Sequence, residues 1–398
     1  MDNRYILGID IGTSTIKAFI GNKMKDGTVF VAGNGTMPTV GIAKGTITDV
    51  EQLAMAISQA VECAVMATHI SVKDAYIGIG GVELSSISGI GSISLSTTDV
   101  IIHDDIERVY QAAILASIPD DHEVLHILPK SFLVDKQRQT HLPLQQQCSH
   151  LEVEAQIVSM PRESVYKLID TVERLGIHIV GVVANHIVAS QVLSNISTEN
   201  YVFMDIGAGT TELMVVRDGQ VHLSAALALG GHYITSDIMN GFEITYQHAE
   251  EIKRYYSKLD KNLRGKNIIL DCNGYGTIDK QFSYDFLYDI IESRIEEIVY
   301  LIHEHLKSTM ELSKFDKILL TGGCSAMLDI RDHIQKLFGI PVEEVNLEEL
   351  LPEYANHTNL ACYGVLTYAV NHIPDAPVAS SHNAWRTLVS KFKNLLTS

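Results

Sequence analysis

The hydrophobic and polar positions at the start of the chain predict a sheet with one helix packed on it. Four short apolar runs are typical of buried strands: residues 5–10, 15–21, 29–33 and 75–79. From residue 50 to 67, apolar side chains recur every three or four positions, which predicts a helix with one buried face. Asp49 precedes this segment and is a residue type expected at an N-cap. The residues predicted to face the core are Leu53, Ala56, Ile57, Ala60, Val61 and Ala64.

Between residues 84 and 160 the pattern changes to that of a small α+β module. Short alternating runs surround a single helical segment at residues 104–116. The earlier pattern then returns, with a helix predicted at 162–175, a strand at 177–183 and a further helix that continues to Leu193. We therefore expect the module to be an insertion within a larger domain.

The second half of the chain repeats the opening pattern. The letters IDIGTST from Ile9 and MDIGAGT from Met204 each end a predicted strand, form a glycine turn and lead into another strand. Further strands are predicted at residues 212–217, 220–228 and 318–320, and helices at 235–238 onward, 249–259, 284–308 and 326–338. The acidic run at 342–352 is interpreted as a solvated surface turn. The repeat predicts two related halves.

Composition narrows the class of protein without identifying it. A chain of 398 residues with 46% hydrophobic and 20% charged residues is expected to fold into several soluble sub-domains. The formal net charge of −18 argues against nucleic acid as a partner, because phosphate binding draws on Lys and Arg. Five scattered cysteines favour reduced thiols in a cytosolic protein. The most apolar stretch, at residues 175–193, contains too many polar residues to predict a membrane span.

Both repeated turns carry the chemistry of a phosphate-binding loop. Glycine allows backbone N–H groups to approach phosphate oxygens, because no Cβ stands in the way. Asp10 and Asp205 would repel phosphate, and suit Mg²⁺ held through water. Two such hairpins facing each other would hold a polyphosphate between two domains, although each alone is more often a simple tight turn. The predicted contacts are Gly12, Thr13, Ser14, Thr15 and Lys17 in the first turn, and Gly207, Ala208, Gly209, Thr210 and Thr211 in the second.

A third glycine turn, at residues 321–325, completes a pattern that resembles the phosphate-one, phosphate-two and adenosine motifs of the actin-like ATPase superfamily. The stretches 183–193 and 358–369 are similar to its two connecting segments. The resemblance implies an α/β, actin-like two-lobed fold of duplicated ribonuclease-H-like domains that binds ATP and Mg²⁺. It also implies nucleotide contacts from Glu250, Lys253, Gly322, Gly323 and Ser325.

Within that superfamily the chain resembles the bacterial cell-division family FtsA. The resemblance rests on GIAKG from Gly41 followed by Asp49, on the run from Asp121 to Pro129, and on GHYITSDI from Gly231. It implies the following divisions: sub-domain 1A at 1–83, 162–194 and 358–371, an inserted α+β sub-domain 1C at 84–161, sub-domain 2A at 195–235 and 310–357, sub-domain 2B at 236–309, a linker at 372–383 and an amphipathic helix at 384–398.

One position departs from the superfamily pattern. Its ATPases place Gln or Glu at the head of the first connecting helix to orient the attacking water, whereas Ala184 stands at the aligned position here. Asn185 and His186 follow it, and either could replace the missing group. We therefore expect ATP binding with weak or no hydrolysis, and we assign no catalytic residue.

The end of the chain predicts a helix that lies on a membrane. Its apolar residues share one helical face: Trp385, Leu388, Val389, Phe392, Leu395 and Leu396. Arg386, Lys391 and Lys393 make this segment basic in an otherwise acidic chain. An amphipathic helix docks more often on the surface of its own protein than on a membrane. The preceding linker, the reversed charge and the only Trp in the chain favour an anionic membrane surface instead.

The resemblance implies a protein that forms filaments and tethers the tubulin-like protein FtsZ to the cytoplasmic face of the inner membrane at the division site, where other division proteins join it. The FtsZ C-terminal tail would dock on sub-domain 2B, where Arg294 and Glu297 match the contact positions of the family. The alternative is that Arg294 and Glu297 are simply a solvent-facing pair of residues on a helix. Two other functions stay open: a small-molecule kinase of the same fold, and an actin-like pilus or shape protein with a different insertion.

Overall fold

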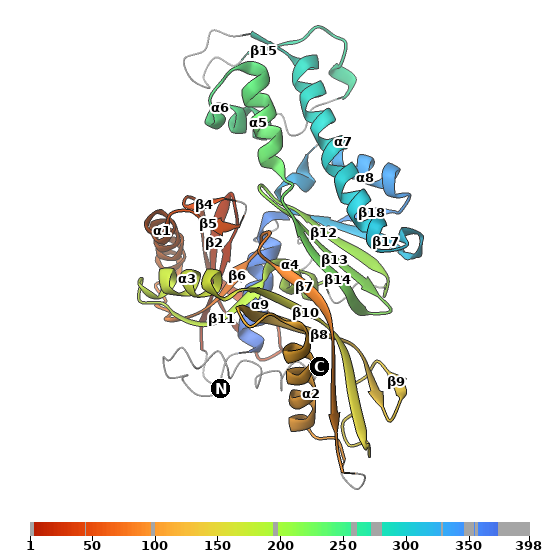
Figure 1. Cartoon of the computed structure of the whole chain (residues 1–398). Helices are drawn as coiled ribbons and strands as arrows, with labels where there is room; N and C mark the ends of the chain where they lie inside the picture. Colours follow the sequence, from red (N-terminus) through yellow and green to blue (C-terminus); the bar gives the residue numbers. More distant parts are fainter. Residues whose placement is uncertain are drawn as a thin grey trace. The chain divides into compact units, whose positions relative to one another are not determined.

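The computed structural model describes residues 4–43, 45–96, 100–193, 198–255, 261–271, 281–327, 329–345, 354 and 357–372. The chain divides into two compact units (Figure 1). The first comprises the described residues of Met1–Glu199, Leu213–Ala226 and Asn359–Ser398, and the second those of Asn200–Glu212 and Leu227–Thr358.

The first unit is built on a five-stranded sheet in the order β11-β6-β1-β2-β3. Its strands are β1 (Ile6–Ile11), β2 (Thr15–Lys23), β3 (Val29–Pro38), β6 (Asp74–Ile79) and β11 (His178–Ala184). β1 pairs antiparallel with β2 and parallel with β6, so it lies at the centre of the sheet. A small hairpin joins β4 (Ile42–Ala43) to β5 (Thr46–Ile47).

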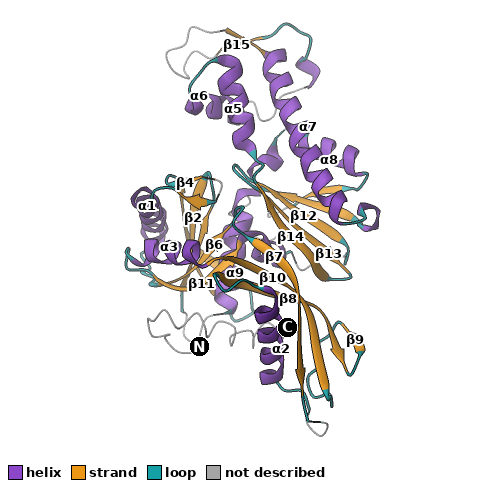
Figure 2. Cartoon of the chain, in the orientation of Figure 1, coloured by secondary structure: helices purple, strands orange, loops and turns teal. Residues whose placement is uncertain are grey.

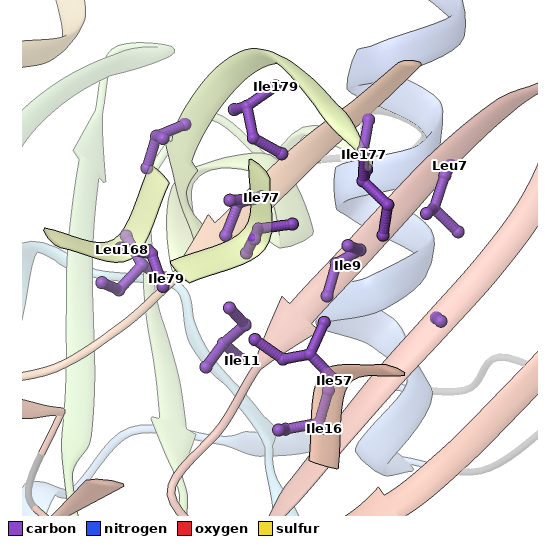
Figure 3. Packing of buried hydrophobic residues seen from close by; sticks show 14 of the residues in the cluster. Leu7, Ile9, Ile11, Ile16, Ile57, Ile77, Ile79, Leu168, Ile177 and Ile179 are labelled. Atoms are coloured by element: carbon purple, nitrogen blue, oxygen red, sulfur yellow. The ribbon is translucent and has the colours of Figure 1, made fainter. Parts of the chain in front are cut away.

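Alternation along β1 divides the sheet into two covered faces. Leu7, Ile9 and Ile11 pack into a buried cluster with Ile57 of α1 (Val50–Thr68) and Leu168 of α3 (Arg162–Glu173), as Figure 3 shows. The N-cap prediction for α1 is confirmed, because the Asp49 side chain accepts a hydrogen bond of 3.0 Å from the N–H of Gln52. The residues of α1 predicted to face the core are all buried.

The other face of the sheet is covered by α9 (Leu360–Asn371), which also packs on α4 (Asn185–Gln191). Gly364 makes this helix pairing close. A Cβ at Gly364 would lie 2.7 Å from backbone atoms of Val188 and Ala189, well inside van der Waals contact. The absence of a side chain there lets α9 lie directly against the helix that follows β11.

The insertion predicted between residues 84 and 160 is a separate antiparallel sheet in the order β7-β10-β8-β9 (Figure 2). The strands are β7 (Ser85–Ser94), β8 (His122–Val134), β9 (Gln137–Gln139) and β10 (His150–Pro161), and α2 (His103–Ser117) packs on one face. Along β10, Leu151, Val153, Ala155 and Ile157 turn toward α2 and join a core with Val109. This module therefore has a hydrophobic core of its own.

The second large sheet has the order β14-β13-β12-β17-β18. Its strands are β12 (Tyr201–Ile206), β13 (Thr211–Arg217), β14 (Gln220–Leu227), β17 (Lys317–Thr321) and β18 (Val342–Glu344). The second unit contains β12, β17 and β18, the helices α5 (Gly231–Phe242), α6 (Tyr246–Tyr255), α7 (Tyr284–Thr309) and α8 (Ile330–Phe338), and a hairpin of β15 (Ile269–Asp271) and β16 (Gln281–Ser283). Short 3-10 turns occur at Lys261–Leu263, Leu312–Lys314, Gly323–Ala326 and His357–Asn359.

Two local predictions were wrong. The start of the acidic run is the edge strand β18 rather than a surface turn, because Val342 is buried while Glu343 and Glu344 stay exposed beside β17. The helix predicted from residue 326 begins only at Ile330, because a 3-10 turn and the left-handed conformation of Asp329 (φ 64°) precede it. Within the described residues, no helix combines the length and the apolar character needed to cross a membrane.

Candidate functional site

The first predicted phosphate turn links β1 to β2 in the first unit. The N–H of Gly12 donates to the carbonyl of Thr15 at 3.2 Å and closes the turn. Thr39, which follows β3, holds it from outside: its N–H donates to the carbonyl of Ser14 at 3.0 Å, and its hydroxyl donates to the carbonyl of Gly12 at 2.7 Å. The turn that contains Thr13 is thus fixed by strand β3 as well as by its own two strands.

Asp10 is a buried carboxylate at the base of this turn. It lies opposite Lys17 in the antiparallel register of β1 and β2. The side-chain Nδ2 of Asn185 donates to its Oδ1 at 2.8 Å. Burial raises the pKa of Asp10 to about 6, although the charge of Lys17 and the hydrogen bond from Asn185 oppose the rise. At pH 7 the carboxylate is therefore ionised and buried, which suits a water-linked Mg²⁺.

At the start of α4, the two residues that follow Ala184 point in different directions, and only one of them contacts Asp10 at the base of the phosphate turn. The N–H of Ala184 donates to Nε2 of buried His126 at 2.9 Å. His186 points elsewhere, with its Nε2 2.7 Å from the hydroxyl of Ser224, and burial lowers its pKa to about 4. Asn185 is the residue whose side chain contacts Asp10. Its own Oδ1 is buried and accepts no hydrogen bond among the described residues.

The second predicted phosphate turn, in the second unit, closes as the first one does. The N–H of Gly207 donates to the carbonyl of Thr210 at 2.9 Å, which is the bond that Gly12 makes to Thr15 in the first turn. The hydroxyl of Thr211 donates to the carbonyl of Leu229 at 2.9 Å. The repeat read from the letters IDIGTST and MDIGAGT therefore extends to the hydrogen bonding of the turns.

The third glycine turn packs against the base of the second. Gly322 adopts φ 92°, a left-handed conformation that favours glycine. A Cβ there would lie 2.3 Å from Oδ1 of Asp205, so only glycine lets the two turns approach this closely. The hydroxyl of Ser325 donates to the carbonyl of Gly322 at 2.8 Å, and the thiol of Cys324 donates to the carbonyl of Gly207 at 3.3 Å.

Glu250 and Lys253 of α6 join this cluster through the start of α5. Nζ of Lys253 donates to the carbonyl of Gly231 at 3.1 Å, to the hydroxyl of Thr235 at 2.8 Å, and pairs with Glu250 at 2.6 Å. Burial alone would raise the pKa of Glu250, but the charge of Lys253 and the hydrogen bonds that it accepts hold the pKa below its ordinary value. The N–H of Gly231 in turn donates to Gly207 at 3.0 Å.

The two units thus each assemble their own share of the predicted nucleotide residues. Asp10, Gly12, Thr13, Ser14, Thr15 and Lys17 lie together in the first, and Asp205, Gly207, Ala208, Gly209, Thr210, Thr211, Glu250, Lys253, Gly322, Gly323 and Ser325 lie on neighbouring turns of the second. Sequence reasoning missed Thr39, Thr235 and Cys324. The position of Cys324 inside the third glycine turn could have indicated its role. The sequence contained no comparable signal for Thr39 or Thr235.

The predicted partner-binding pair lies on α7. Arg294 donates from Nε and Nη2 to the two carboxylate oxygens of Asp237 on α5, at 2.5 and 3.0 Å, and also pairs with Glu297. Its guanidinium lies 5.7 Å from the centre of the Tyr233 ring. Asp237 therefore orients Arg294. The sequence could not indicate this role, because it depends on the packing of α5 on α7. The whole predicted membrane helix, from Trp385 to Leu396, lies outside the described residues.

Comparisons with known proteins agree with this architecture. The family model described as "SHS2 domain inserted in FTSA" matches residues 81–159, and the one described as "Cell division protein FtsA" matches residues 202–363. Cell division protein FtsA of Pseudomonas aeruginosa is 28% identical over 374 residues, which cover 91% of this chain and 89% of that protein. The protein of the same name from Bacillus subtilis is 28% identical over 331 residues, with coverages of 82% and 75%.

Solved structures share the fold at lower sequence identity. A chain of the PilM-PilN type IV pilus biogenesis complex has a TM-score of 0.67 and 16% identity, and the match covers 93% of this chain and 99% of that one. ADP-bound MreB5 of Spiroplasma citri has a TM-score of 0.52 and 13% identity, with coverages of 91% and 94%. The fold is therefore actin-like α/β, and it carries an inserted α+β domain.

Proposed function

Because the chain belongs to the FtsA family of bacterial cell-division proteins, we propose that it binds ATP with Mg²⁺, self-associates, and tethers FtsZ polymers to the cytoplasmic face of the inner membrane. Nucleotide binding is supported most directly by one observation: the turns at Gly12 and Gly207 are closed by the same hydrogen bond, and each follows a strand that carries an aspartate. A glycine-closed turn of this kind suits the phosphates of a nucleotide.

The residues of these turns have distinct parts in the proposed binding. Backbone N–H groups and the hydroxyl of Thr13 would donate to phosphate oxygens, and the ammonium of Lys17 would balance their charge. Asp10 and Asp205 would hold Mg²⁺ through water. Mg²⁺ held there would neutralise phosphate charge, and Glu250 and Lys253 would contact the ribose and the base.

Hydrolysis is expected to be slow. The side chain that would orient water is replaced by Ala184, and Nδ2 of Asn185 already donates to Asp10 at 2.8 Å. Purified protein should release phosphate at well under ~1 s⁻¹, the lower end of ordinary enzyme turnover. Phosphate release from radiolabelled ATP measures this rate. An Asp10→Asn variant, purified in the same way, shows how much of it comes from contaminants.

Turnover of many ATP per second, abolished in the Asp10→Asn variant, would contradict this expectation. It would mean that a group other than the residue at position 184 orients the water, and it would favour the kinase alternative.

Binding of the FtsZ tail is expected to depend on Arg294. In Arg294→Glu a carboxylate would face Asp237 and Glu297, so the guanidinium is lost and like charges meet. Hydrogen bonds to charged groups contribute roughly 1.5–3 kcal/mol, so affinity for an FtsZ tail peptide should fall about 10- to 100-fold. Fluorescence anisotropy with a labelled peptide measures the change.

Two further variants separate recognition from structure. Arg331→Glu reverses an exposed charge on α8 and should leave peptide affinity unchanged. Arg294→Lys keeps the charge but loses the two-pronged contact, and should have an intermediate effect. Equal affinity of Arg294→Glu and the intact protein, with both folded, would remove residue 294 from the binding surface.

A further inference from the structure

A cluster of two carboxylates and an imidazole lies on α7 and α8, on a different side of α7 from Arg294. Glu292 and Glu296 are four residues apart on α7, so their side chains leave the same face of the helix. α8 packs along α7, as Figure 1 shows, and places His333 beside this face. One donor atom from each of the three side chains lies within 4.8 Å of the others.

The contacts around these groups leave donor atoms available. Nδ1 of His333 is 3.7 Å from Oε1 of Glu296, too far for a hydrogen bond, and this is the one ion-pair contact of Glu296 among the described residues. Glu292 uses Oε2 to accept from Arg264 at 3.0 Å, which leaves its Oε1 for another partner. The Glu296 carboxylate is 61% exposed, whereas His333 is only 17% exposed, so the cluster opens to solvent on the glutamate side.

From this arrangement we propose that Glu292, Glu296 and His333 form a binding site for Zn²⁺, with water completing the coordination. Zn²⁺ accepts imidazole nitrogen together with carboxylate oxygen, and three protein ligands with an open position are a common Zn²⁺ arrangement. Mg²⁺ and Ca²⁺ prefer oxygen ligands alone, so the imidazole selects against them. The two carboxylates balance the charge of the ion.

Only small side-chain movements are needed to bind the ion. Tetrahedral ligands at Zn²⁺ bond lengths of ~2.0–2.1 Å lie roughly 3.3 Å apart. Glu296, whose side chain is 61% exposed, covers the remaining distance by changing rotamer. Because Glu292 and Glu296 belong to α7 and His333 belongs to α8, a bound ion would link the two helices. The site uses none of the predicted nucleotide or FtsZ residues and does not depend on the proposed function.

Calorimetric titration of the full chain with ZnCl₂ tests the site directly. The protein is first treated with a chelator and is titrated without nucleotide, so that Mg²⁺ or Zn²⁺ at the phosphate turns does not contribute. We expect one Zn²⁺ per chain to bind, and the affinity to fall at least about tenfold in both Glu296→Gln and His333→Gln. Glu304→Gln is the matched control, because it removes an exposed charge from the same helix outside the cluster.

Thermal melting provides a second test, of whether bound Zn²⁺ stabilises the packing of α7 on α8. Zn²⁺ should raise the melting temperature of the intact protein and of Glu304→Gln, and should leave Glu296→Gln and His333→Gln unchanged. Circular dichroism and melting without metal establish that all four proteins are folded. The proposal is overturned if none of the folded proteins binds Zn²⁺, or if all four bind it with the same affinity and the same shift in melting temperature.

Discussion

Replacing both Trp385 and Phe392 with Glu is expected to abolish binding of the protein to anionic vesicles. Both residues lie on the apolar stripe of the predicted C-terminal helix. The segment is too short to be a stable helix in water, so it should fold only when it reaches a bilayer. A charge on the buried side loses the apolar contribution of the ring and adds a cost of desolvation.

The energies explain why two substitutions suffice. Burying six large apolar side chains gains about 9 kcal/mol at ~1.5 kcal/mol each. Three basic residues add about 3 kcal/mol near anionic lipid. Ordering thirteen residues costs about 13 kcal/mol. The gains and the cost nearly cancel, so one helix by itself binds weakly at best, and stable attachment requires an array of chains. This is why self-association belongs to the proposed function.

Vesicle flotation measures this effect, and the chain provides a matched control. Thr387→Glu with Asn394→Glu changes the net charge equally, but on the opposite side of the helix. This control variant should float less well only because its electrostatic attraction to the anionic lipid is weaker. Its remaining binding should decrease as the salt concentration rises. If Trp385→Glu with Phe392→Glu and a chain ending at Ser380 both float as well as the intact protein, the segment does not bind membranes.

Replacing Asp205 with Ala is expected to weaken ATP binding by about 10- to 100-fold. The carboxylate stands at the end of β12, against the third glycine turn, where a Cβ at Gly322 would lie 2.3 Å from its Oδ1. Its loss would remove the charge-assisted contacts that we propose it makes to hydrated Mg²⁺, each contributing roughly 1.5–3 kcal/mol. The smaller side chain should leave β12 and the turn in place.

Calorimetry with ATP and Mg²⁺ measures the loss. Asp26→Ala removes a carboxylate from the exposed turn between β2 and β3, where it accepts hydrogen bonds from Thr28, and should not change ATP affinity. Asp205→Asn keeps the shape and removes the charge, so it should bind ATP less tightly mainly when Mg²⁺ is present. Unchanged affinity in a folded Asp205→Ala protein would show that the turn at Gly207 does not bind nucleotide phosphates.

Strands and helices with strong periodicity could be predicted from the sequence. α1 is the clearest case, because its buried residues repeat at helical spacing and Asp49 caps its start. The edge strand β18 could not be predicted, since it is short and only Val342 of its three residues is buried. The start of α8 was misplaced because the backbone of Asp329 interrupts a sequence that reads as continuous helix.

The candidate site was predictable where its residues lie next to each other in the chain. Gly12 and Gly207 stand in short motifs that repeat, so the turns could be found without a fold. Their partners could not, because they come from distant positions. Thr39 reaches the first turn from the end of β3, and Asp237 orients Arg294 across the packing of α5 on α7. Such pairings depend on tertiary packing, which leaves no local pattern.

Recruitment of FtsZ to anionic vesicles by this chain tests the proposed tethering most directly. Vesicles are mixed with FtsZ, ATP and Mg²⁺, with or without the intact chain, and floated through a density gradient. FtsZ should float only when the intact chain is present, and should stay at the bottom when the chain carries Arg294→Glu or ends at Ser380. FtsZ that stays at the bottom with the intact chain, while the chain itself floats, would contradict tethering.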